Sequence, residues 1–124
     1  VDMRKKSHKF SFHMFSKLCI LIQNFNIKMI REITDEKLAK YFDVSTQAYN
    51  KVKISSPDKT HLYKMAQDFL QMAKNYIDDA HHFKEKGEIV TAFAALNYAH
   101  GWLDAGARAG LFDVDHDNQL FTVD

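Results

Sequence analysis

The chain has 124 residues, of which 46% are hydrophobic and 27% charged, and its formal net charge is +1. This composition is that of one globular domain; it excludes a disordered, collagen-like or disulfide-scaffold chain and gives no reason to expect a nucleic-acid partner. The single cysteine, Cys19, excludes an intrachain disulfide and a Cys-based zinc site, and it predicts a reducing, cytoplasmic location.

Residues 1–28 differ in composition from the rest of the chain. They carry a net charge of +5, whereas the remaining residues carry −4. A membrane-spanning helix needs about 20 apolar residues, and the longest unbroken apolar run here is the five residues 18–22, so a span is excluded. A signal peptide, a basic helix on a membrane surface, and a non-native or mobile extension before an internal start at Met29 remain. We favour the extension, which makes membrane-surface contact the less favoured alternative.

The first predicted helix covers residues 34–53. Thr34 is a suitable N-cap because its hydroxyl can accept a hydrogen bond from a backbone N–H of the first turn. Asp35 and Glu36 face the positive end of the helix dipole. The run at residues 44–46 lowers helix propensity, so a break there stays open.

The second predicted helix has the clearest signals. Ser56 followed by Pro57 is typical of an N-cap with proline at the first helical position, and Gly87 suits the left-handed residue that ends a helix. Between these ends, apolar residues recur at spacings of three and four: Leu62, Met65, Ala66, Phe69, Met72, Ala73, Tyr76, Ile77, Ala80 and Phe83. The pattern predicts an amphipathic helix of about 30 residues.

The third predicted helix covers residues 88–109 and ends at Gly110. Placed 100° apart, four polar residues fall on one narrow line, called the polar stripe below: Asn97, His100, Asp104 and Arg108. Almost every other position is apolar or small, which predicts a helix that is buried over most of its circumference. Gly101 and Gly106 further predict close approach of neighbouring backbones.

Together these elements predict an all-α fold, an up-and-down three-helix bundle, because the short loops force antiparallel neighbours. The bundle domain is expected over residues 29–112, followed by an acidic, mobile tail over residues 113–124. Two partners from the same chain cover only part of the third helix. We therefore expect a homodimer through this helix, or its coverage by residues 1–28 as an extra N-terminal helix.

Two segments resemble a small archaeal family, the domain of unknown function 357. They are residues 73–80 (AKNYIDDA) and residues 97–106 (NYAHGWLDAG), and the resemblance extends over about residues 29–113. It implies a short helical bundle in an archaeal cytosol. The family has no known activity, cofactor or catalytic residue to carry over.

The polar stripe is the best candidate site. His100 and Asp104 are neighbours on the helix surface, as are Asp104 and Arg108, so the carboxylate can orient the imidazole or pair with the guanidinium. One interpretation is a recognition face for a small anionic or nucleotide-like ligand, or an acid–base pair. The other is a solvated stripe or a polar seam that fixes helix register, which we favour because such pairs are common on helix surfaces.

Metal sites have weaker support. Asp78 and His82 are four residues apart on the second helix, but the paired Glu-x-x-His motif of di-metal bundles is missing. The run from Asp113 to Asp117 is similar to the start of a calcium loop, yet Asn118 stands where that loop needs glycine. We therefore predict no metal and no other cofactor.

These patterns favour a non-enzymatic interaction or oligomerisation module. We expect self-association through the third helix and an unidentified protein partner, with no catalytic residue. The alternative is a binder of a small anionic or nucleotide-like ligand through the polar stripe.

Overall fold

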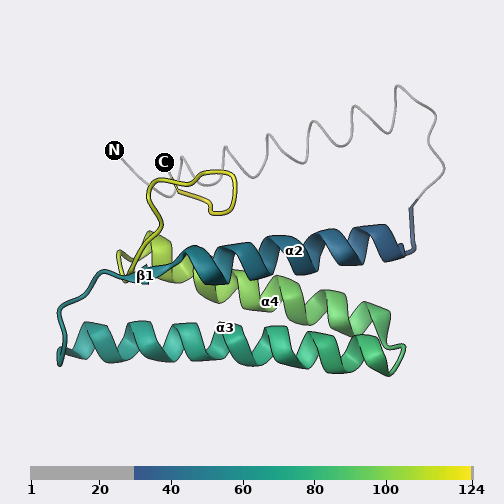
Figure 1. The fold of residues 1–124 in the computed structure, drawn as a ribbon, viewed down its shortest axis with the longest axis horizontal. Helices are drawn as coiled ribbons and strands as arrows, with labels where there is room; N and C mark the ends of the chain where they lie inside the picture. The colour runs from purple at the N-terminus through teal and green to yellow at the C-terminus, as the bar shows by residue number, and fades with distance from the viewer. Residues whose placement is uncertain (1–29, 124) are drawn as a thin grey trace. The chain divides into compact units, whose positions relative to one another are not determined.

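The computed structural model describes residues 30–123, of which residues 33–123 belong to one packed unit. Three helices dominate it: α2 (Asp35–Lys51), α3 (His61–Glu85) and α4 (Ile89–Arg108). Figure 1 shows α4 between α2 and α3, with each helix antiparallel to the one before it. The predicted up-and-down three-helix bundle is confirmed. The expected extension or extra helix at residues 1–28 lies outside the described residues.

Caps and glycines set the helix ends. Thr34 Oγ1 accepts a hydrogen bond from the Lys37 amide at 3.1 Å, so Thr34 is the N-cap of α2 as predicted. Gly87 and Gly110 follow α3 and α4 with φ of +78° and +77°, the left-handed conformation that glycine adopts most readily. The break left open at residues 44–46 does not occur, because α2 is continuous and buries Ser45.

The start of α3 differs from the prediction. Its N-cap is Thr60, whose Oγ1 accepts from the Tyr63 amide at 3.2 Å and donates to Pro57 O at 2.6 Å. Lys59 has a φ of +62°, a conformation that cannot continue into a right-handed helix. Ser56 and Pro57 therefore lie in the preceding turn, and α3 has 25 residues instead of about 30.

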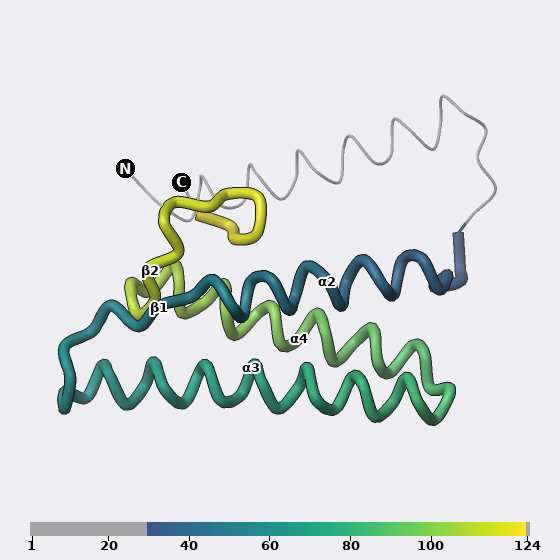
Figure 2. The backbone as a smooth tube through the Cα atoms, in the orientation of Figure 1, coloured from purple at the N-terminus to yellow at the C-terminus, as the bar shows by residue number. Residues whose placement is uncertain are grey.

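A short antiparallel pair joins the two ends of the helical hairpin. β1 (Lys53–Ile54) precedes α3 and β2 (Phe112–Asp113) follows α4, with Lys53 opposite Asp113 (Figure 2). The Ser55 amide extends the pairing by donating to Leu111 O at 3.0 Å. This pairing fixes where the chain leaves α4.

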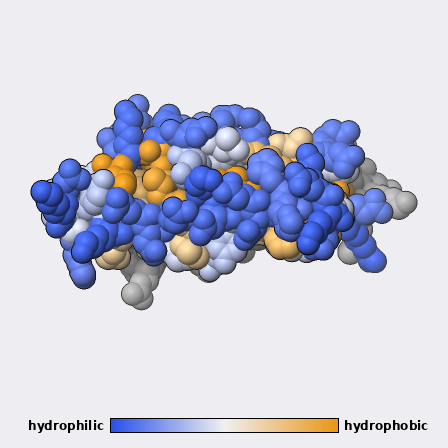
Figure 3. All heavy atoms as spheres, turned by 60° about the horizontal axis from the view of Figure 1, so that its bottom comes forward, coloured by the Kyte–Doolittle hydropathy of each residue, from blue (hydrophilic) through white to orange (hydrophobic). Residues whose placement is uncertain are grey.

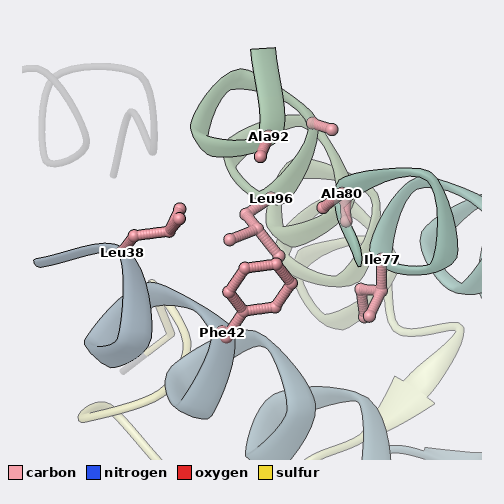
Figure 4. Close-up of a cluster of buried hydrophobic side chains, with 8 residues drawn as sticks. Leu38, Phe42, Ile77, Ala80, Ala92 and Leu96 are labelled. Carbon is pink, nitrogen blue, oxygen red and sulfur yellow. The ribbon is translucent and has the colours of Figure 1, made fainter. Parts of the chain in front are cut away.

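The core consists of two buried clusters. The first joins all three helices through Leu38, Phe42, Ile77, Ala80, Ala92, Ala95, Leu96 and Ala99 (Figure 4). The second joins residues of the helices with residues beyond the end of α4. Its buried members are Ala48, Ala66, Ala73, Leu103, Leu111, Phe112, Val114 and Phe121. Leu111, Phe112, Val114 and Phe121 therefore extend the hydrophobic core beyond the helices. Over the described range 30–123, no helix combines the length and apolarity that crossing a bilayer requires.

The two glycines inside α4 have different surroundings. A Cβ added at Gly106 would overlap the ring of Phe112, so this glycine permits a close contact, with a side chain and not with a helix backbone. Gly101 is exposed, and a Cβ added there would meet nothing within 4 Å. The predicted close approach of a neighbouring backbone is therefore found at neither glycine: Gly106 makes room for the Phe112 ring, and a Cβ at Gly101 has no neighbour within 4 Å.

Candidate functional site

Residues 113–123, called the tail below, pack against the helices. Phe121 is only 3% exposed and Val114 5%, and both lie in the buried cluster that contains Ala48 of α2 and Leu103 of α4. Apolar residues interrupt the acidic ones along this segment, and their burial favours an ordered position. The expected mobility of the tail is therefore wrong for residues 113–123.

The polar stripe of α4 binds the backbone of the tail. His100 Nε2 lies 2.7 Å from Leu120 O, Asp104 Oδ1 accepts from the Thr122 amide at 2.9 Å, and Arg108 Nη1 donates to Thr122 O at 2.7 Å. The hydrogen bond to Leu120 O requires the proton of His100 on Nε2. Three of the four predicted stripe residues therefore form one polar seam between α4 and the tail.

Asn97, the fourth stripe residue, is not part of this seam. Its Nδ2 donates to Phe93 O at 2.9 Å, one turn earlier in the same helix, and its side chain is exposed. Asn97 thus lies on the predicted face without contributing to the tail contacts.

Two further contacts hold the tail. The Phe121 ring stacks on the His100 ring with centroids 6.1 Å apart and an interplanar angle of 25°. Lys51 Nζ, at the end of α2, pairs with Asp117 Oδ2 at 2.8 Å. The other carboxylate oxygen of Asp117 accepts from the amides of Gln119 and Leu120.

These bonds change the pKa of Asp117. The hydrogen bond from Lys51, followed by the amide of Leu120, lowers the pKa of Asp117 below its usual value because both favour the charged carboxylate. The same bond to Asp117 raises the pKa of Lys51. The ion pair between α2 and the tail therefore forms over the whole neutral pH range.

A tight turn places the tail over α4. Asp115 and His116 have φ of +57° and +54°, and the Asp117 amide donates to Val114 O at 3.2 Å. Positive φ at both central residues is the pattern of a type I′ turn. Asp113 Oδ1 accepts from the Asp115 amide at 2.9 Å, so the aspartates that suggested a calcium loop act as turn acceptors here. Asp124, the twelfth position of that loop, lies outside the described residues.

Besides Asn97 and Arg108 of the polar stripe, α4 exposes a strip of apolar or small residues. It is called the α4 strip below and consists of Val90, Ala94, Tyr98, Gly101 and Ala105. Val90 is 71% exposed and Tyr98 52%. The tail partly covers His100 and Asp104, whereas Asn97 and Arg108 are exposed, so the polar stripe is only partly open to solvent.

Aromatic side chains run along the seam between α3 and α4, beside this strip. Tyr76 meets Tyr98 edge to face with ring centroids 4.5 Å apart, and Phe69 meets Trp102 in the same way at 5.0 Å. Figure 3 shows apolar atoms in patches between hydrophilic side chains on the surface. The α4 strip is therefore bordered by aromatic rings whose positions are fixed by packing.

The comparison with known families decides the identity. A family model described as a protein of unknown function (DUF357) matches residues 40–112. The chain belongs to the DUF357 family. The matched range contains all of α3 and α4 and the four stripe residues, which confirms the resemblance found in residues 73–80 and 97–106. No curated protein and no solved structure matches the chain.

The weak metal candidates of this DUF357 chain are not brought together. Asp78 Oδ2 pairs with Lys74 Nζ at 2.6 Å, and this bond raises the pKa of Lys74. His82 is exposed and lies beside Phe83, with ring centroids 6.2 Å apart. Within residues 30–123, no three His, Cys, Asp or Glu side chains are grouped as a metal site would need.

Sequence reasoning found one side of the tail contact and missed the other. The stripe was visible as a polar line on an apolar helix, but its partners on the tail were not identified: Leu120, Phe121 and Thr122. The separate pair of Lys51 with Asp117 was missed as well. The available signal was the hydrophobic character of Val114, Leu120, Phe121 and Val123 in an otherwise acidic segment. Chemically, the arrangement binds the backbone of a turn at residues 118–122 together with one aromatic anchor, Phe121.

Proposed function

We propose that this DUF357 bundle is a non-enzymatic interaction module that forms a homodimer through the α4 strip. The observation that supports it most is the strip itself, whose five positions carry no charge although 27% of the chain is charged. Val90 and Tyr98 expose large apolar surface there. Exposed apolar surface of this kind marks protein interaction sites.

A second copy of the chain is the partner that fits the strip best. Ala94, Gly101 and Ala105 are small, so a facing helix can approach toward the short end of the usual range of about 8–10 Å. A two-fold axis brings identical strips together, which places Tyr98 of each copy against small residues of the other. Because Tyr98 already packs on Tyr76, its ring loses little freedom on binding.

The polar stripe supports a structural role more than a catalytic one. His100, Asp104 and Arg108 are the strongest candidates for chemistry, and each contacts the backbone of the tail. The alternative function, a binder of a small anionic or nucleotide-like ligand through Asn97 and these three residues, requires displacement of the tail. We therefore prefer the interaction module, which uses no cofactor.

The cellular setting is also part of the proposal. One cysteine in 124 residues supports a reducing compartment, and we propose the cytoplasm. An archaeal origin and a further protein partner are inferred from the family resemblance and from the exposed apolar surface, respectively.

Light scattering of the full chain tests the homodimer, with two matched alanine-to-glutamate variants. Ala94→Glu places a carboxylate in the α4 strip of each copy, where association of the strips would bury it without a partner. Ala39→Glu makes the same change at an exposed alanine of α2. We expect wild type and Ala39→Glu to be dimers at high micromolar concentration and Ala94→Glu to be a monomer. A monomeric wild type, or equal behaviour of the two variants, would contradict the proposal.

A further inference from the structure

The tail and α4 form a peptide complex within one chain. Side chains of α4 bind the carbonyl of Leu120 and both the amide and the carbonyl of Thr122, and between these two residues the Phe121 side chain is buried. The bound residues form a turn, in which the Phe121 amide donates to Asp117 O at 3.1 Å, and α4 holds this turn through its backbone and one buried side chain. The surface formed by His100, Asp104, Arg108 and Lys51 is called the tail-binding surface below.

We propose that the tail-binding surface also binds the tail of a second copy, so that two chains exchange residues 117–123. The contacts of residues 117–123 with the helices would then be made between chains: Phe121 of one copy stacks on His100 of the other, and Asp117 of one copy pairs with Lys51 of the other. We choose the tail of a second copy as the ligand because the same sequence already binds the tail-binding surface within one chain. The two copies complete each other's site.

The turn at residues 114–117 supplies the hinge. Asp115 and His116 are two consecutive non-glycine residues with φ of +57° and +54°. This left-handed conformation is unfavourable for residues with a Cβ, and it is relieved when the turn opens into extended chain. Both residues are exposed, so opening the turn does not itself disturb the core. Short hinges under strain favour exchange of the segment that follows them.

The balance between the closed and the exchanged form depends on protein concentration. Exchange reproduces the same hydrogen bonds, ion pair and ring stacking, so these contacts favour neither form. The hinge favours exchange, whereas the loss of translational and rotational freedom opposes it. Exchange is therefore expected to increase with concentration. Exchange of the tail uses residues outside the α4 strip. A negative result for exchange would therefore leave the homodimer proposed above unaffected.

A pair of substitutions at one hinge residue tests the exchange. His116→Pro cannot adopt positive φ and disfavours the left-handed conformation of Asp115 as well, so it opens the turn. His116→Gly accepts positive φ freely and stabilises the closed turn. Both are made in the full chain carrying Ala94→Glu, which removes association through the α4 strip. We expect a dimer for His116→Pro and a monomer for His116→Gly; a folded, monomeric His116→Pro chain would overturn the proposal.

Binding of the isolated tail provides a second measurement that does not require the hinge variants to fold. A fluorescent peptide of residues 113–123 is titrated into the full-length Phe121→Ala chain, whose own anchor is missing. We expect this peptide to bind the Phe121→Ala chain at least about tenfold more tightly than the same peptide with Phe121→Ala does. It should also bind that chain more tightly than it binds wild type, whose tail-binding surface is filled by its own tail. Should the Phe121→Ala chain not fold, Thr122→Pro replaces it, since proline has no amide to bond Asp104 and also restricts the backbone of Phe121. Absence of binding to a folded variant would refute the proposal.

Discussion

The same glycine-to-alanine substitution at two positions of α4 is predicted to have opposite effects on stability. Gly101 and Gly106 lie in the interior of one helix, five residues apart, so alanine brings the same gain in helix propensity at both. A Cβ at position 101 meets nothing within 4 Å, whereas a Cβ at position 106 overlaps the ring of Phe112. The pair therefore isolates the cost of that single contact.

The magnitudes follow from the surroundings. Gly101→Ala should raise the free energy of unfolding by about 0.5–1 kcal/mol, because alanine loses less backbone entropy on folding. At position 106 the Phe112 ring must shift, and it is only 4% exposed and belongs to a residue paired with Ile54. Overpacking of this kind costs about 1–3 kcal/mol. Because the propensity gain cancels between the two variants, this steric cost is the expected difference between them.

Urea unfolding of both variants measures this difference. In the Ala94→Glu background, where self-association through the α4 strip does not contribute, the Gly106→Ala midpoint should lie below that of Gly101→Ala by about 1 M at the usual dependence on urea. Gly101→Ala should unfold later than its parent. Equal midpoints, or a Gly106→Ala chain more stable than Gly101→Ala, would refute the assignment of Gly106 to the Phe112 contact.

Three further outcomes follow from the contacts. Phe121→Ala should lower the free energy of unfolding by about 3 kcal/mol, since it empties a buried position in the second cluster; urea unfolding checks it. Folding lowers the pKa of Asp117 below its usual value of 3.8, so the bond to Lys51 stabilises the folded chain above that pH and is lost as the pH falls through the lowered pKa. When unfolding is followed against pH, Asp117→Asn should therefore lose less stability on the acid side than wild type. Thr60→Ala should cost about 1 kcal/mol by removing the N-cap of α3, whereas Ser56→Ala should change stability by less than about 0.5 kcal/mol in the same thermal unfolding assay.

The helices were predictable because their signals are local. The cap at Thr34 and the left-handed glycines at Gly87 and Gly110 depend on residues within one turn, and the apolar spacing of α3 and α4 depends on helix geometry alone. The start of α3 was placed too early because Ser56 with Pro57 and Thr60 are competing N-cap signals. The backbone conformation at Lys59 decides between them.

The partners of these elements were not predictable from local pattern. The polar stripe was recognised as a line of residues, yet periodicity does not say whether such a line faces solvent or another segment. The tail reaches it only after the turn at residues 114–117, and the pairing of β1 with β2 joins residues about 60 positions apart. Such long-range contacts depend on the whole packing, which is why the tail was not recognised as the partner of the polar stripe.

Hydrogen exchange at one backbone amide tests most directly whether the polar stripe holds the tail. In wild type the Thr122 amide donates to Asp104 Oδ1 at 2.9 Å. We predict that this amide is protected from exchange in the wild-type chain and that Asp104→Ala removes the protection while the amides of α3 stay protected. A Thr122 amide that exchanges in wild type as fast as in an unstructured peptide would contradict the docking of the tail on α4.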